Sequence, residues 1–251
     1  PWRMSNGSTW QLAGPNIPSG NQISAIGIAP SASSVVFLGF NNGYIARSEN
    51  ALDASPTWTI RSGGLPIGNW VSSVAVDPQN PDIAYCTYST FDIDHIYKTT
   101  NGGVDWVPID GIGFEGVPDI PVHWLAVRPC NSDHLYAATE LGVFASSDAG
   151  QTWAPVNDGL AHCRVESLDF QNDGDTLVAF TYGRSAFVAD LEPCDRCLAD
   201  FDGNGTVDTL DVLLFLAAWN LGEPDADFND DGLIDTRDVI LFLGLWAAGC
   251  P

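Results

Sequence analysis

Four tryptophans recur at almost constant intervals in the first two thirds of the chain. Trp10, Trp58, Trp106 and Trp153 each follow a threonine or an aspartate, and the intervals between them are 48, 48 and 47 residues. A fixed period of this length is typical of repeat architectures, in which each repeat is one small unit that stacks on its neighbours. The spacing therefore predicts four copies of one structural unit.

Each copy contains the same succession of short extended segments. First segments with alternating apolar residues lie at 23–30, 71–78, 122–129 and 165–170. Second segments follow at 35–40, 83–88, 135–139 and 177–181, and third segments at 44–47, 96–98, 143–145 and 186–189. The tryptophan opens a fourth. Four short antiparallel strands about every 40 to 50 residues predict a mainly β fold of β-propeller blades. A β-sandwich is the alternative, but it does not explain the period.

The turn before two of the tryptophans carries a motif. Residues 146–153 have the sequence Ser-Ser-Asp-Ala-Gly-Gln-Thr-Trp, and residues 99–106 have Thr-Thr-Asn-Gly-Gly-Val-Asp-Trp. The first resembles the Asp-box of the BNR repeat family, Ser-x-Asp-x-Gly-x-Thr-Trp, and the second is a variant of it. The carboxylate or carboxamide accepts turn N–H groups, and glycine permits a positive φ. We expect structural roles for Thr99, Asn101, Gly103, Trp106, Ser146, Asp148, Gly150 and Trp153.

The resemblance covers about residues 1–191 and implies a β-propeller segment of about four blades. The family includes sialidases, xyloglucan hydrolases, sortilin-type receptors and a photosystem assembly factor, so it does not define a function. The fourth copy has no Asp-box and lacks a fourth strand. Residues 10–12 can supply that strand and close a ring. A truncated larger propeller is the favoured interpretation, because four blades is the low end of the known range.

No set of residues in the repeats points to a catalytic site. The arginines do not recur at strand-matched positions, and hydrolysis by two carboxylates across a cleft needs more than part of one propeller. Asp77, Glu166 and Asp169 are expected to be solvated strand ends. The loop aromatics are expected to pack between blades, with stacking on sugars as the alternative; they are Trp70, Phe91, Phe114 and Trp124. This segment is not expected to be an enzyme by itself; if it is one, glycoside hydrolysis is the expected reaction.

Acidic residues are concentrated near the C-terminal end. The whole chain has 32 acidic and 9 basic residues, which gives a formal net charge of −23. Residues 198–251 hold 11 acidic residues and one basic residue, so their charge is −10. Within this stretch, residues 200–211 recur 27 positions later as residues 227–238. This duplication marks a second kind of repeat.

Both copies fit the twelve-residue calcium loop. Such a loop places oxygen ligands at positions 1, 3, 5, 7, 9 and 12 and a glycine at position 6, which is Gly205 or Gly232 here. The predicted ligands of the first loop are Asp200, Asp202, Asn204, Thr206, Asp208 and Asp211. Those of the second loop are Asp227, Asn229, Asp231, Leu233, Asp235 and Asp238. The sequence therefore predicts two bound Ca²⁺ ions.

An apolar helix follows each loop but does not precede it, and position 12 is aspartate. This arrangement resembles the type I dockerin domain, a small α-helical, EF-hand-like calcium module. The expected organisation is a propeller segment at 1–191, a linker at 192–197 and a dockerin-like domain at 198–251. The resemblance implies that loop positions 10 and 11 contact a cohesin-like partner; they are Thr209, Leu210, Thr236 and Arg237. The family often has Ser-Thr there, so the partner stays open and cell-surface anchoring is an alternative.

The six cysteines are compatible with disulfides but do not define their pairing. Because dockerin termini lie close together, we hypothesise a Cys197–Cys250 bond. The pairing of Cys86, Cys130, Cys163 and Cys194 stays open. Cysteines that are compatible with disulfide bonds, together with the calcium loops, favour an extracellular or cell-surface location.

The charge also limits the partners. A net charge of −23 with a single lysine, Lys98, argues against nucleic acids and anionic membranes. No apolar run reaches the roughly 18 residues that span a bilayer. We expect the C-terminal part of a secreted protein, in which the calcium module attaches the propeller to a scaffold or surface protein; a polysaccharide is a further candidate partner. The alternatives are the targeting end of a glycoside hydrolase that degrades polysaccharide, and a calcium-stabilised structural terminus.

Overall fold

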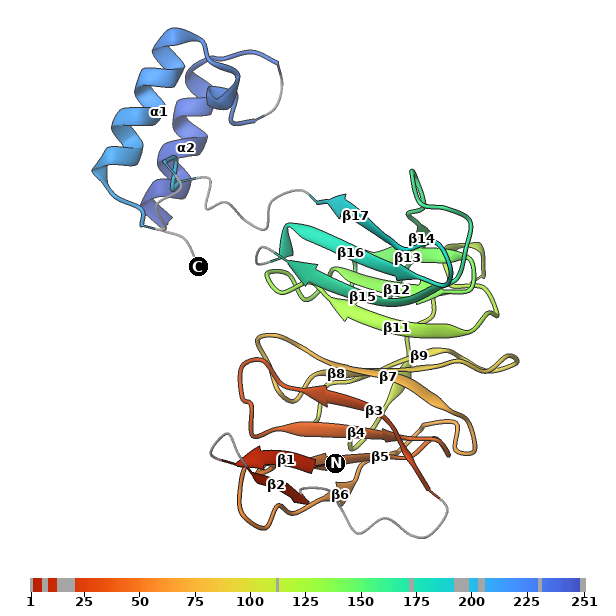
Figure 1. Cartoon of the computed structure of the whole chain (residues 1–251). Helices are drawn as coiled ribbons and strands as arrows, with labels where there is room; N and C mark the ends of the chain where they lie inside the picture. Colours follow the sequence, from red (N-terminus) through yellow and green to blue (C-terminus); the bar gives the residue numbers. More distant parts are fainter. Residues whose placement is uncertain are drawn as a thin grey trace. The chain divides into compact units, whose positions relative to one another are not determined.

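The computed structural model describes residues 2–5, 9–12, 21–111, 113–171, 174–191, 199–202, 206–229 and 232–248. The chain divides into two compact units, Pro1–Glu192 and Pro193–Pro251, which are described separately. The first unit is built of β-sheets and the second of two helices (Figure 1). No helix among the described residues is both long and apolar enough to cross a membrane.

Four of the antiparallel sheets described in the first unit are blade-like, and we name them blades A to D. Blade A has β3 (Ile23–Ile28), β4 (Val36–Phe40), β5 (Ile45–Ser48) and β6 (Thr59–Ile60). Blade B has β7 (Val71–Val76), β8 (Ala84–Tyr88), β9 (Ile96–Thr99) and β10 (Val107–Pro108). Blade C has β11 (Val122–Val127), β12 (Leu135–Thr139), β13 (Gly142–Ser146) and β14 (Ala154–Pro155), and the 3₁₀ turn η1 (Gly113–Glu115) precedes it. The predicted mainly β fold of propeller blades is confirmed.

Blade D has three strands, β15 (Val165–Gln171), β16 (Thr176–Thr181) and β17 (Ala186–Asp190). The segment that sequence analysis offered as its fourth strand forms β2 (Thr9–Leu12). This strand pairs with β1 (Trp2–Ser5) in a separate two-stranded sheet and not with β17. Blade D therefore keeps an edge without a neighbouring strand in the part of the chain that the structure describes.

The blades lie side by side through their first strands (Figure 1). β3 packs against β7, β7 against β11 and β11 against β15. No contact of comparable extent joins β15 to β3 within the described residues, so the blades form an open arc. The first strands line a groove of about 420 Å³, to which Ile26, Trp124 and Phe170 contribute.

Tryptophan side chains fill the spaces between consecutive blades. Trp106 lies in the core between blades A and B, with its ring edge-on to Phe37 at 6.4 Å between centroids, and its Nε1 donates to the Arg61 carbonyl at 2.9 Å. Trp153 lies in the core between blades B and C, and its Nε1 donates to the Ile109 carbonyl at 2.7 Å. The 48-residue period is thus the period of an inter-blade contact.

Hydrogen bonds within the Asp-box turns place these tryptophans. Oδ1 of Asp148 accepts the Thr152 N–H at 2.9 Å, Oδ2 accepts the Thr152 hydroxyl at 2.7 Å, and the Ser146 hydroxyl accepts the Gly150 N–H at 2.9 Å. Gly150 has φ = +94°, and a Cβ there would lie 2.6 Å from Ile109 Cδ1. Asn101 accepts the corresponding N–H from Asp105 at 3.0 Å.

The longer loop of blade A contains an equivalent turn. Oδ1 of Asn50 accepts the N–H of Thr57 at 2.9 Å and its hydroxyl at 3.0 Å, and Trp58 follows directly. The inserted residues therefore enlarge the Asp-box turn of this blade without removing its central acceptor.

The second unit consists of α1 (Thr209–Leu221), the short 3₁₀ turn η3 (Pro224–Ala226) and α2 (Thr236–Ala248). Its core is a cluster of four phenylalanines. Phe215 and Phe242 stack at 4.0 Å between centroids, and the rings of Phe201 and Phe228 stand edge-on to them. Each stacked ring comes from a helix and each flanking ring from a loop, so the core joins both repeats.

We predict that Trp153→Ala destabilises the propeller segment by about 3–5 kcal/mol, because it removes a large buried side chain and leaves a cavity between blades. Trp70→Ala is the matched control, since Trp70 is 47% exposed, and it should cost about 1 kcal/mol or less. Urea denaturation in excess calcium measures both. Equal losses would contradict the assigned packing role.

The Asp148 turn should also make stability depend on pH. Donation by the side chain and the N–H of Thr152 lowers the pKa of Asp148 from 3.8 to about 2. A carboxyl with a lower pKa in the folded state stabilises above its unfolded pKa and loses that contribution as pH falls. The stability advantage over Asp148→Asn, which keeps an acceptor as Asn101 does, should therefore shrink between about pH 4 and pH 2. A difference that does not change with pH in urea denaturation would contradict this.

Candidate metal centre

The first acidic loop brings three carboxylates to one point. Oxygens of Asp200, Asp202 and Asp211 all lie within 4.8 Å of one another, and these residues hold positions 1, 3 and 12 of the loop. Carboxylate charges this close repel one another unless a cation lies between them. Hard oxygen ligands gathered from both ends of a short loop suit a divalent cation such as Ca²⁺.

The position-12 carboxylate is fully buried and held by the backbone. Asp211 has no exposed surface; its Oδ2 accepts the Asp208 N–H at 2.8 Å and its Oδ1 accepts the Asp202 N–H at 3.2 Å. Burial opposes the charged form of Asp211, but the backbone N–H donors outweigh it and lower the pKa of this carboxyl. Asp211 is therefore a carboxylate that ties the start of the loop to the start of α1.

The second loop repeats this arrangement. Asp238 is also fully buried; its Oδ2 accepts the Asp235 N–H at 2.7 Å, and its Oδ1 accepts the N–H groups of Phe228 and Asn229 at 2.9 and 3.2 Å. These donors, the Asp235 N–H first, lower the pKa of Asp238. The position-12 carboxylates of the two loops are therefore held by the backbone in the same way.

The carboxylate of Asp227, at position 1 of the second loop, shows whether the loop suits a cation. Its Oδ2 accepts the N–H of Gly232, which makes the turn at φ = +79°. Its Oδ1 is buried and has no hydrogen-bond partner within the described residues. A buried carboxylate oxygen without a donor is costly, and a cation is the partner that such an oxygen lacks.

Four of the other predicted ligands fall into two pairs. Asn204 and Asp231 lie outside the described residues. Thr206 and Leu233, at position 7, are exposed, and the structure does not test the carbonyl role expected for them. The predictions for all four stay open.

The position-9 aspartates cap the helices. Oδ1 of Asp208 accepts the Leu210 N–H, and Oδ1 of Asp235 accepts the Arg237 N–H, both at 2.7 Å. Asp208 forms a capping box with Asp211, which satisfies N–H groups at the start of α1. Both aspartates were predicted as metal ligands and not as helix caps, although an aspartate before an apolar helix is the sequence signal for a cap.

Each helix also reaches the loop of the other repeat. Trp219 of α1 donates its Nε1 hydrogen to the Asp235 carbonyl at 2.9 Å, and Trp246 of α2 donates to the Asp208 carbonyl at 2.8 Å. The two bonds relate the repeats by an approximate twofold symmetry. They connect the two loops, so that the geometry of one depends on the packing of the other.

The predicted partner-binding residues lie on the surface beside these loops. Thr209, Leu210, Thr236 and Arg237 are all exposed. Of the cysteines, Cys86 and Cys163 are free and Cys130 is disulfide-bonded, whereas Cys197 and Cys250 of the hypothesised bond lie outside the described residues.

Charged residues of the propeller segment form a second cluster, near the first residues of β11 and β15. His123 Nε2 lies 3.1 Å from Oε1 of Glu140, and Arg164 contacts Glu140 at 3.6 Å and Glu166 at 2.9 Å. Burial, followed by the charge of Arg164, lowers the pKa of His123. Both glutamates pair with one guanidinium, so neither is an isolated acid or base.

Sequence analysis did not foresee the bulges that position this cluster. Each first strand shifts register near its start, which leaves Ser24, Ser72, His123 and Glu166 as the extra residues. The expectation for Asp77 was wrong: it is 2% exposed, and its Oδ1 accepts the N–H groups of Gln79 and Asn80, because it closes the turn after β7.

Several solved structures resemble the propeller segment. An ancestral GH74 enzyme matches over 67% of this chain and 22% of its own length, with 19% identity and a TM-score of 0.51. A GH74 enzyme from Niastella koreensis matches over 66% and 28%, with 19% identity and a TM-score of 0.49. The GH74 xyloglucanase from Xanthomonas campestris matches over 62% and 26%, with 15% identity and a TM-score of 0.49.

The likeness to the ancestral enzyme shows the β-propeller fold alone, since identity is below one fifth. This chain spans only about a quarter of the length of the three structures. No family model and no curated protein matches it.

We predict that the chain binds two Ca²⁺ ions, one at each loop. Asp200→Ala should weaken one site at least about tenfold, because affinity follows the number of charged ligands. Asp225→Ala, in η3 between the loops, removes the same charge at a residue that is not a predicted ligand and should leave both affinities nearly unchanged. Isothermal titration calorimetry measures the sites. Equal affinities in the two variants, or no binding by the unmodified chain, would contradict the assignment.

Proposed function

We propose that the C-terminal unit is a calcium-dependent docking module of the dockerin type, which attaches the propeller segment to a scaffold or cell-surface protein. The observation that carries this proposal is the duplicated loop with a buried, backbone-held carboxylate at position 12, in Asp211 and Asp238. The acidic triad around Asp211 supports a metal-binding role for it. Each ion would order a loop whose end is also the start of a helix.

The surface of the helices supports a protein partner. Apolar side chains are exposed at matching positions of the two helices, namely Leu213 and Ile240, Leu214 and Leu241, and Leu216 and Leu243. Leu210, at loop position 10, adds to this surface and is 47% exposed. Exposed apolar residues gathered on so small a unit favour a binding surface over a merely solvated terminus.

The alternative function is targeting of a glycoside hydrolase. It is supported by the propeller fold that this segment shares with an ancestral GH74 enzyme and by the groove along the first strands, where Trp124 is accessible to a sugar ring. In this case the calcium module would bring a polysaccharide-degrading enzyme to its substrate or scaffold. The two functions share the module and differ in what the propeller does.

An extracellular or cell-surface location belongs to both proposals. Loops of this kind in extracellular modules work at the high calcium concentrations found outside cells. Cys130 is disulfide-bonded, and an oxidising compartment preserves such bonds.

We predict calcium-dependent binding of the full chain to an immobilised type I cohesin in surface plasmon resonance. EGTA should abolish it, and Leu210→Asp should weaken it at least about tenfold, because a charge replaces an apolar contact at the interface. Leu221→Asp is the control, since Leu221 is exposed at the far end of α1. Equal effects of the two substitutions would contradict the assigned surface. Hydrolysis or binding of xyloglucan by the same chain would favour the enzyme-targeting alternative.

A further inference from the structure

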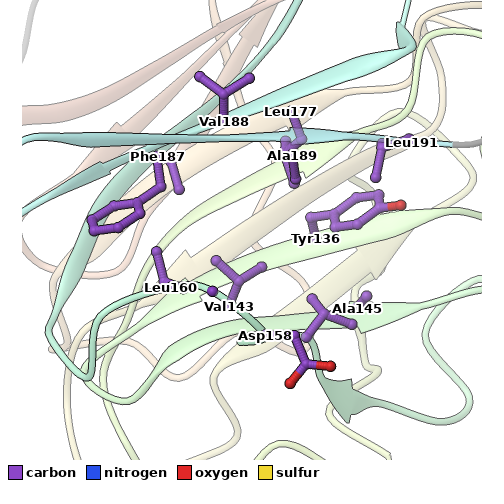
Figure 2. A pocket seen from close by; sticks show the side chains of 13 residues that line it. Tyr136, Val143, Ala145, Asp158, Leu160, Leu177, Phe187, Val188, Ala189 and Leu191 are labelled. Atoms are coloured by element: carbon purple, nitrogen blue, oxygen red, sulfur yellow. The ribbon is translucent and has the colours of Figure 1, made fainter.

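The space between blades C and D lacks the tryptophan that fills the two preceding spaces. Trp106 lies between blades A and B and Trp153 between blades B and C, whereas the described core between blades C and D contains no tryptophan. Within the residues that the structure describes, blade D has no fourth strand to carry one. An apolar pocket of about 270 Å³ lies in this space instead (Figure 2).

The walls of the pocket repeat the surroundings of the two tryptophans. Tyr136 is the second residue of β12, the place that Phe37 has in β4 and Tyr85 in β8. Phe37 contacts Trp106, and Tyr85 belongs to the cluster around Trp153. Figure 2 shows Tyr136 and Val143 of blade C facing Phe187 and Ala189, which point from β17 into the pocket. An aromatic residue of the pocket wall thus has the strand position of the aromatic residues that surround the inter-blade tryptophans.

The pocket also includes a residue at the position of the carbonyl that accepts each indole N–H. Trp106 donates to the carbonyl of Arg61 and Trp153 to that of Ile109, and each acceptor directly follows the fourth strand of the preceding blade. The residue in that place after β14 is Val156, which lines the pocket.

The edge of β17 presents backbone groups to a further strand. Leu191 N–H donates to the Asp175 carbonyl and Thr181 N–H to the Ser185 carbonyl, so bonds to β16 alternate along β17. By this alternation the N–H and carbonyl of Val188 face away from β16. Val188 takes the place of Ala145, which pairs with Ala154 in blade C, and is itself 66% exposed. An edge of this kind binds an added strand.

We infer that this pocket and the edge of β17 form a docking site for a strand that follows a tryptophan, and that its occupant is Thr9–Leu12 of a second copy of this chain. Trp10 belongs to the 48-residue series and is followed by two extended residues, as the inter-blade tryptophans are. Within one chain β2 pairs with β1, in a sheet separate from blade D. Each chain thus carries one donor strand and one acceptor site, which joins copies head to tail.

Sedimentation velocity of the full chain over a range of concentrations tests this inference. The unmodified chain should self-associate, and Trp10→Ala should weaken the association at least about tenfold, because a buried indole dominates such a contact. Trp70→Ala, which alters an exposed tryptophan that does not line the pocket, should have no effect. A chain that is monomeric at every concentration, or association that Trp10→Ala leaves unchanged, overturns the inference.

A mixing experiment tests the direction of the contact. Val188→Pro removes the N–H at the edge of β17 and should also abolish self-association. Trp10→Ala keeps the acceptor site and Val188→Pro keeps the donor strand, so a mixture of the two should form a heterodimer. If Val188→Pro unfolds by circular dichroism, Ala189→Arg, which places a charge in the pocket, replaces it. A folded acceptor variant that gives no heterodimer overturns the inference, and neither result depends on the proposed docking function.

Discussion

An indole held between two neighbouring sheets is the contact on which the propeller segment depends. Trp106 and Trp153 each pack against the preceding blade and donate a hydrogen bond to a carbonyl at its end. The Asp-box turn before each tryptophan places the ring. The turn, the sequence period and the packing of the blades therefore all depend on the same tryptophan. Beside blade D the described residues include no such tryptophan, and a pocket and an unpaired strand edge lie there instead.

The C-terminal unit depends on a different interaction. Its carboxylates lie close together and repel one another, and a cation would bind between them. Four phenylalanines contact one another in its core, and a core this small supplies little folding free energy. The first loop gathers acidic oxygens around Asp211, and backbone N–H groups lower the pKa of Asp211 and that of Asp238 in the second loop. A bound cation would turn that repulsion into a stabilising contact. Part of the net charge of −23 thus lies in the carboxylates of the candidate metal centre.

The features that sequence analysis predicted correctly are local or periodic. Four sheets follow from segments that recur about every 40 to 50 residues, and the acidic triad follows from the spacing within one short loop. Its errors involve contacts between distant segments or choices between competing partners. Asp77 was expected in solvent but closes a buried turn, and the capping of α1 by the Asp208 side chain was not predicted. A carboxylate can accept hydrogen bonds from backbone N–H groups or bind a cation, and the sequence pattern alone does not show which of these partners it has.

By itself the sequence determined the blade repeat, the turns that position the tryptophans and the duplicated acidic loops, because each depends on residues close together in the chain. Only the tertiary structure decided that Thr9–Leu12 leaves blade D unpaired, that Trp219 and Trp246 cross to the opposite loop, and that a pocket lies where a third inter-blade tryptophan would be. These outcomes depend on which surfaces meet. That choice is made by packing between distant residues, whose separation in sequence carries no periodic signal.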